Sequence, residues 1–184
     1  KHKTRFASVR FGNVLNPNGS VLHIFKNQIE NNLPLTITSE DMSRFFITMS
    51  QAVDLCLHAG NNMIGGEIFV SGMGCCNIMS LARALVGEES FDYKIIGEKP
   101  GEKSYEELVT ETEAQRTVCE KNLYTIIPDS LDVMPSGILD SYMQAFDNAP
   151  RLSGPLRSDQ NMLTESEIRS MLQSVGKFEE KSGE

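Results

Sequence analysis

Two arginines in this sequence have neighbours that suit an anionic ligand. Arg10 and Asn13 lie at the end of an apolar, β-prone stretch, and Arg44 directly precedes an aromatic pair. Ligands of open α/β sheets bind beyond the carboxyl ends of strands, and an arginine presents a planar set of donors that matches phosphate. We therefore expect an anion site at Arg10 or Arg44, although a strand-to-turn junction or a surface ion pair would explain the same residues.

The other reactive side chains show no catalytic pattern. Cys75 and Cys76 are adjacent and no C-x-x-C spacing occurs, so we expect neither a metal site nor a disulfide scaffold. His23 and His58 fall in predicted helices without a paired ligand or nucleophile. The sequence contains no G-x-G-x-x-G, P-loop, G-x-S-x-G or H-E-x-x-H motif. These residues therefore predict a binding site without a catalytic residue.

Short apolar runs that alternate with helical patterns predict an α/β fold to position these residues. Phe6 to Leu15 reads as one strand buried on both faces, followed by a turn at residues 16–19 and by Ser20, a helix N-cap. Further strands are expected at residues 35–38, 44–47, 67–70, 93–96 and 124–127. Helices are expected at 21–30, 48–59, 78–85, 135–146 and 163–175. Because nothing precedes the first strand to cover it, the sequence resembles the second half of a longer fold.

Length and charge narrow the class of protein. The 184 residues are 40% hydrophobic and 23% charged, which suits a globular core, and no apolar run approaches the length of a membrane span. The formal net charge of −8 comes without a Lys/Arg cluster, which argues against a nucleic-acid partner. We expect a domain over residues 1–148, a linker over 149–162, and a C-terminal helix and tail over 163–184.

Five ordered motifs carry a resemblance to a known family. They are FASVRFGNVLNPNGSV (6–21), LTITSEDMSRFFITMSQA (35–52), GEIFVSGM (66–73), residues 80–85, and GEKPGEKSYEEL (97–108). Together they resemble the polysaccharide biosynthesis (CapD-like) branch of the extended short-chain dehydrogenase/reductases. These are NAD(P)-dependent nucleotide-sugar dehydratases and epimerases, typified by UDP-N-acetylglucosamine 4,6-dehydratases. The resemblance implies a Rossmann-like fold to which this chain contributes late parallel strands and a small substrate-binding subdomain.

The resemblance also implies roles for individual residues. Arg44 would pair with the diphosphate of a UDP-sugar, and Glu102 would accept hydrogen bonds from the ribose hydroxyls. Lys99 stands where the family usually has an arginine, so it would offer a point charge in place of a bidentate fork. The remaining implied contacts are Asn13 with the sugar nucleotide, Ser20 and Val21 around the nucleotide, Ile37 and Thr38 along the uridine, and Val14 and Leu15 near the nicotinamide of NAD or NADP.

The catalytic parts of such enzymes are expected upstream of this chain. The family uses a glycine-rich dinucleotide loop and a Tyr-x-x-x-Lys pair, and neither occurs in this sequence. We therefore expect the UDP-sugar-binding portion of a lyase or epimerase of polysaccharide or surface-glycan synthesis, homo-oligomeric when complete and inactive without its N-terminal half. The alternative is a non-catalytic module that binds a nucleotide sugar or a protein partner. A cytoplasmic location is expected, with an upstream membrane anchor left open.

Overall fold

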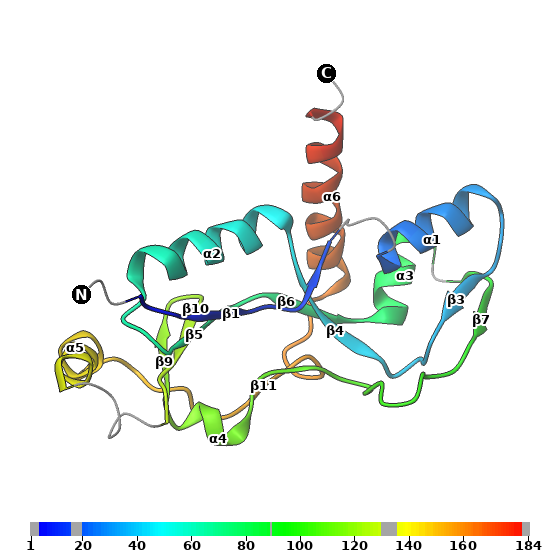
Figure 1. The fold of residues 1–184 in the computed structure, drawn as a ribbon. Coiled ribbons are helices and arrows are strands. Elements are labelled where there is room, and N and C mark those ends of the chain that lie inside the picture. Colours follow the sequence, from blue (N-terminus) through cyan, green and yellow to red (C-terminus); the bar gives the residue numbers. More distant parts are fainter. Residues whose placement is uncertain (1–3, 16–19, 89, 130–135, 182–184) are drawn as a thin grey trace. The chain divides into compact units, whose positions relative to one another are not determined.

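The computed structural model describes residues 4–15, 20–88, 90–129 and 136–181, in which helices and strands alternate as the α/β prediction requires (Figure 1). The helices are α1 (Val21–Glu30), α2 (Met49–Asn62), α3 (Ile78–Val86), α4 (Glu111–Ala114), α5 (Ser136–Phe146) and α6 (Glu165–Lys181). The strands are β1 (Ser8–Arg10), β2 (Asn13–Val14), β3 (Leu35–Ile37), β4 (Ser43–Ile47), β5 (Ile68–Ser71), β6 (Gly74–Asn77), β7 (Tyr93–Ile95), β8 (Glu107–Val109), β9 (Thr117–Glu120), β10 (Leu123–Ile126) and β11 (Leu156–Arg157). The turn expected at residues 16–19 and the helix start expected at residue 135 lie outside the described residues.

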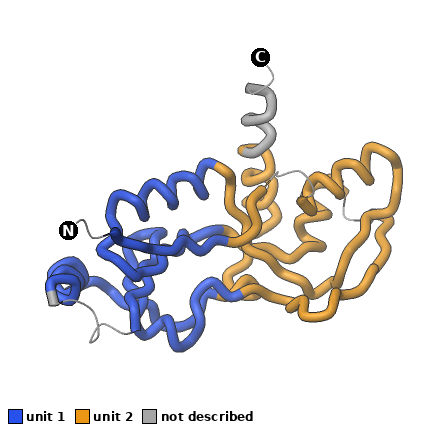
Figure 2. The backbone as a smooth tube through the Cα atoms, in the orientation of Figure 1, with its two compact units in different colours: residues 1–11, 50–73, 107–156 blue, residues 12–49, 74–106, 157–184 orange. Residues whose placement is uncertain are grey.

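The chain forms two compact units, each built from three separate segments (Figure 2). Unit 1 contains residues 1–11, 50–73 and 107–156, and unit 2 contains residues 12–49, 74–106 and 157–184. Residues 149–162, which the sequence predicts as a linker, contribute to both units. The Leu152 N–H donates to the Thr117 carbonyl at 3.0 Å within unit 1, and Ser158 is fully buried in unit 2.

Unit 1 is organised around a mixed sheet with the strand order β1-β5-β10-β9. β1 and β5 run parallel, with Val9 opposite Phe69, whereas β10 is antiparallel to both β5 and β9. Helix α2 contributes Leu55 and Ala59 to a cluster with Phe69. This helix runs through Gly60 to Asn62, so the predicted end at Gly60 is wrong.

The predicted strand at Phe6–Leu15 is also wrong in its extent, because the chain changes sheets inside it. β1 ends at Arg10, and β2 begins at Asn13 and pairs in parallel with β4 of unit 2. The break lies at Gly12, where a Cβ atom would come within 2.4 Å of the Phe45 Cβ and 2.6 Å of the Phe45 carbonyl oxygen. Only glycine permits this approach between the two backbones.

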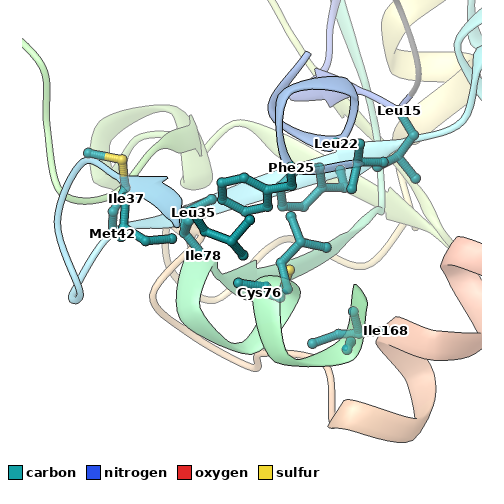
Figure 3. Close-up of a cluster of buried hydrophobic side chains, with 13 residues drawn as sticks. Leu15, Leu22, Phe25, Leu35, Ile37, Met42, Cys76, Ile78 and Ile168 are labelled. Carbon is teal, nitrogen blue, oxygen red and sulfur yellow. The ribbon is translucent and has the colours of Figure 1, made fainter. Parts of the chain in front are cut away.

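Unit 2 contains the sheets β2-β4-β6 and β3-β7 and packs them under α1, α3 and α6. Its core, shown in Figure 3, includes Leu22 and Phe25 of α1 and Ile168 of α6, which is fully buried. The predicted C-terminal helix is present and docks on this core, because Met171 and Leu172 join Ile168 against it. A capping box starts this helix: the backbone N–H of Thr164 donates to Glu167 Oε2 at 2.8 Å, and the backbone N–H of Glu167 donates to the Thr164 hydroxyl oxygen at 3.4 Å.

Candidate functional site

A cavity of about 390 Å³ opens in unit 2 between β2, α1, β3 and β4. Leu15, Phe25, Met42 and Ile78, which Figure 3 labels, form part of its apolar wall. Eight residues singled out from the sequence line it: Asn13, Val14, Leu15, Ser20, Val21, Thr38, Arg44 and Glu102. Folding therefore brings residues as far apart in the sequence as 13 and 102 to the wall of one cavity.

Two of the predicted site residues lie elsewhere. Ile37 is fully buried in the hydrophobic core of unit 2 and does not line the cavity. Lys99 is exposed and is absent from the lining, although its backbone N–H donates to Glu102 Oε2 at 3.1 Å. That bond keeps Lys99 next to a cavity residue.

The position of Arg44 is fixed by three hydrogen bonds and a further ion pair. Its Nη1 donates to the carbonyl oxygens of Ser43 at 2.8 Å and Ser104 at 3.4 Å. Its Nη2 lies 3.3 Å from Glu102 Oε1, and its Nε lies 3.5 Å from Glu106 Oε1. A guanidinium has five N–H groups, so the second Nη2 hydrogen is left for a ligand, and a ligand that needs both must displace Glu102. The side chain is only 12% exposed, which makes an unpaired charge there costly.

Asn13 is held in a similar way. Its Nδ2 lies 3.2 Å from the Phe45 carbonyl oxygen and 3.2 Å from each carboxylate oxygen of Glu106. These acceptors fix the orientation of the amide and engage both of its N–H groups, so its Oδ1 is the atom left to accept a hydrogen bond. A ligand that needs a donor from Asn13 must displace Glu106.

Glu106 is a charged residue beside the cavity that the sequence did not predict, as it did not predict the lining residues Leu22, Phe25, Thr36, Met42, Phe46 and Ile78. It accepts from Asn13, faces the Arg44 guanidinium and lies 3.4 Å from the Phe45 backbone nitrogen. The one signal in the sequence is its place in the GEKSYEEL segment, four residues after Glu102. Glu102 and Glu106 place two carboxylates beside the single guanidinium of Arg44, so the formal charge of these three side chains is negative.

The carboxylate of Glu113 occupies the place beside Arg10 where the sequence predicts an anionic ligand. In unit 1 the Arg10 guanidinium donates to the two oxygens of Glu113 at 2.9 and 3.0 Å and to the Leu108 carbonyl at 2.7 Å. Hydrogen bonds from Arg10, helped by two from Thr110, lower the pKa of Glu113 to about 2. Arg10 therefore belongs to a structural ion pair and not to the cavity of unit 2.

The adjacent cysteines are buried in β6. Burial raises the pKa of both thiols, that of Cys76 to about 12, so they stay protonated at neutral pH. Among the described residues, no group of three or more His, Cys, Asp or Glu side chains is placed to hold a metal ion. In the same part of the chain, no helix is both long and apolar enough to cross a membrane.

Comparison with known proteins places the chain in a family. A family model described as "Polysaccharide biosynthesis protein" matches residues 1–128. The chain belongs to this family. Its relatives include the capsular polysaccharide biosynthesis protein CapD of Staphylococcus aureus, 43% identical over 128 residues that cover 66% of this chain and 21% of CapD. They also include a UDP-glucose 4-epimerase of Rickettsia bellii, 40% identical over 135 residues, covering 72% of this chain and 40% of the epimerase.

The fold agrees with that of a solved member of the same family. The X-ray structure of Pen from Bacillus thuringiensis superposes with a TM-score of 0.77 at 36% sequence identity, covering 92% of this chain and 50% of Pen. The chain thus spans half or less of the length of each of these relatives. The match supports a mixed α/β fold with parallel strands, as β1 and β5 show.

Proposed function

We propose that this chain is the UDP-sugar-binding portion of an NAD(P)-dependent nucleotide-sugar 4,6-dehydratase or epimerase, of the UDP-N-acetylglucosamine type. The observation that carries the proposal is the gathering of eight predicted contact residues around one cavity of about 390 Å³. Pockets for small molecules occupy roughly 300–1,000 Å³, so the space suits part of such a ligand. Membership of the polysaccharide biosynthesis family and the relative named UDP-glucose 4-epimerase support a nucleotide sugar.

In the proposed complex the diphosphate replaces Glu102 as the ionic partner of Arg44. Glu102 now lies 3.3 Å from Arg44 Nη2, where a phosphate oxygen would bind. When the phosphate takes that donor, Glu102 turns to the ribose hydroxyls, so Arg44 keeps a charged partner and Glu102 exchanges its ion pair for hydrogen bonds. Such charge-assisted bonds are stronger than neutral ones, and Arg44 suits a phosphate because its donors form a planar fork. The backbone N–H of Lys99 donates to Glu102 at 3.1 Å, and we propose that the exposed ammonium of Lys99 offers the diphosphate a second positive charge.

The cofactor would meet only a small part of this chain. Val14 and Leu15 offer an apolar surface that suits the face of a nicotinamide ring, and no residue of the sequence forms a G-x-G-x-x-G loop. NAD(P), when bound, supplies the hydride acceptor and donor of this reaction class. Because the sequence also lacks a Tyr-x-x-x-Lys pair, the residues of this chain would bind and orient the substrate and would not transfer protons.

The fold supports a place for unit 1 within a larger parallel sheet. β1 is an edge strand of the sheet β1-β5-β10-β9. Among the described residues, no strand pairs with its other side. Phe6, which precedes β1, is 77% exposed. An unpaired edge strand leaves a row of N–H and C=O groups open, so earlier strands of a Rossmann-like sheet would pair with β1 in the whole, homo-oligomeric protein.

Calorimetric titration tests the proposed ligand. We expect the 184-residue chain to bind UDP and UDP-N-acetylglucosamine, and Arg44→Ala to weaken both at least tenfold, because the diphosphate loses its charged donor. Arg83→Ala is the matched control, since Arg83 is an exposed cation of α3 outside the cavity and the change in charge is the same. Equal UDP affinity of Arg44→Ala and wild type would contradict the role of Arg44.

The same samples separate a chain that binds a nucleotide sugar from a module that binds only a protein partner. A chain that melts cooperatively by circular dichroism and binds UDP supports a substrate-binding portion. If the chain melts cooperatively but binds neither UDP nor UDP-N-acetylglucosamine, the proposal is refuted, and a module that binds a protein partner remains.

A further inference from the structure

We infer that Ser158 is a positioning residue for the cavity of unit 2, acting through Ser43 and Glu106. It lies in the C-terminal part of the chain, beyond the residues 1–128 that the family model matches. Its side chain is fully buried, and it belongs to the same unit as the cavity. A fully buried hydroxyl is costly unless every polar partner is matched, so its hydrogen bonds indicate what it holds.

The bonds of the Ser158 hydroxyl are fully accounted for. Its Oγ donates to the Ser43 carbonyl oxygen at 3.0 Å and accepts from the Glu106 backbone N–H at 2.8 Å. The Ser43 Oγ lies 3.0 Å away, and since a hydroxyl has one hydrogen, Ser43 must be the donor in that contact. The backbone N–H of Ser158 also donates to the Glu106 carbonyl oxygen at 2.9 Å. One buried residue thus ties the start of β4 to the segment that ends at Glu106.

Both tied segments carry side chains of the cavity. The Ser43 carbonyl that Ser158 engages also accepts from Arg44 Nη1 at 2.8 Å. The Glu106 carboxylate accepts from Asn13 Nδ2 at 3.2 Å and lies 3.5 Å from Arg44 Nε. A shift of the Glu106 backbone therefore reaches the amide of Asn13 and the guanidinium of Arg44 at once. The expected effect of Ser158 on UDP binding rests on the proposed function, whereas its hydrogen bonds to Ser43 and Glu106 do not.

Hydrogen exchange of two side chains tests the inference without a ligand. In nitrogen-15 NMR spectra of the full chain, we expect Ser158→Ala to accelerate solvent exchange of the Arg44 Nε–H and the Asn13 Nδ2 hydrogens at least tenfold. The matched control is Thr117→Val, which removes another fully buried hydroxyl, bonded to the Glu113 carbonyl at 2.7 Å in unit 1. The control should leave both exchange rates within twofold of wild type, since the Thr117 hydroxyl bonds to Glu113 and to neither of these groups.

The results separate a positioning role from a loss of stability. Unchanged exchange at Arg44 and Asn13 in Ser158→Ala would overturn the inference, as would equal acceleration in Thr117→Val. Should Ser158→Ala fail to fold, Ser158→Cys keeps a side chain of similar size with a weaker acceptor. It should give a smaller acceleration at the same two groups, and no acceleration would overturn the inference.

A ligand titration then connects the network to binding. UDP affinity should fall about tenfold in Ser158→Ala and stay within twofold of wild type in Thr117→Val. Equal UDP affinity of Ser158→Ala and wild type would overturn the positioning role. If wild type itself does not bind UDP, the proposed function fails, while the exchange rates still decide the role of Ser158.

Discussion

Replacing Glu113 with glutamine should remove a pH-dependent part of the stability of unit 1. The carboxylate receives two hydrogen bonds from Arg10, which lower its pKa from 4.5 to about 2. At about 1.4 kcal/mol for each pH unit, this shift sets an upper limit of about 3 kcal/mol. The side chains of Glu113 and Arg10 are 14% and 33% exposed, so solvent screening reduces the expected contribution to about 2 kcal/mol.

The direction of the pH effect follows from the lowered pKa. A carboxylate whose pKa falls on folding contributes its full stability above pH 4.5 and loses it as the pH falls towards 2. Glu113→Gln is neutral throughout this range, yet glutamine still fits the capping box with Thr110, because Glu and Gln both occupy that position. The variant should therefore unfold about 2 kcal/mol more easily than wild type at pH 7, and the two should converge near pH 2.

Urea unfolding followed by circular dichroism at several pH values measures this difference, and a carbon-13 NMR titration gives the pKa of Glu113 directly. Glu111→Gln is the matched control, because Glu111 is exposed on the same short helix and lies outside the Arg10 pair. That control should change the free energy of unfolding by less than about 0.5 kcal/mol. Parallel pH profiles for wild type and Glu113→Gln would refute the reasoning.

Three further substitutions test the packing within each unit, one by NMR spectra and two by urea unfolding. Gly12→Ala should prevent the native fold of unit 2, seen as loss of its dispersed NMR signals, because its Cβ would lie 2.4 Å from that of Phe45. Ile168→Ala should lower the free energy of unfolding by about 3 kcal/mol, since it empties a fully buried site against α3. Tyr142→Phe should lower it by about 1–3 kcal/mol, because the buried Glu67 carboxylate loses a 2.9 Å hydrogen bond.

Each of these three substitutions has a control variant at an exposed or open position. Gly60→Ala has no atom within 4 Å of its new Cβ and should leave the fold intact, so a native spectrum for Gly12→Ala would contradict the close-approach argument. Met162→Ala, at a side chain 41% exposed, should cost far less than Ile168→Ala. Tyr93→Phe, on an exposed tyrosine of β7, should be nearly neutral. A stability of Tyr142→Phe equal to that of wild type would show that Glu67 does not need the hydroxyl.

Local sequence patterns were sufficient where the neighbouring residues decide the structure. Ser20 caps α1 as predicted and accepts from the His23 N–H, and Gly87 ends α3 in the left-handed conformation with φ of 82°. The short helix α4 could also have been found, since Thr110 and Glu113 form a capping box that is visible in the sequence. Caps act within one turn of helix, so one sequence window contains all of their partners.

Contacts between distant segments account for what the sequence could not predict. Nothing around Gly12 indicates that Phe45 fills the space beside it and breaks the expected strand. β6 was missed because its Gly-Cys-Cys-Asn sequence has little strand propensity and is stabilised by pairing with β4. The cavity residues were found through a family resemblance, whereas Glu106 and Ser158 gain their roles only from partners far away in the chain.

The two units are interleaved along the chain, and this has a consequence for how the protein can be divided. The backbone passes from one unit to the other after residues 11, 49, 73, 106 and 156. No single cut yields either unit whole: stopping after residue 106, for example, removes β9 and β10 from unit 1 and Ser158 from unit 2. Gene fusions and domain swaps at one junction would therefore damage both units, so these 184 residues are best exchanged between relatives as one inseparable cassette.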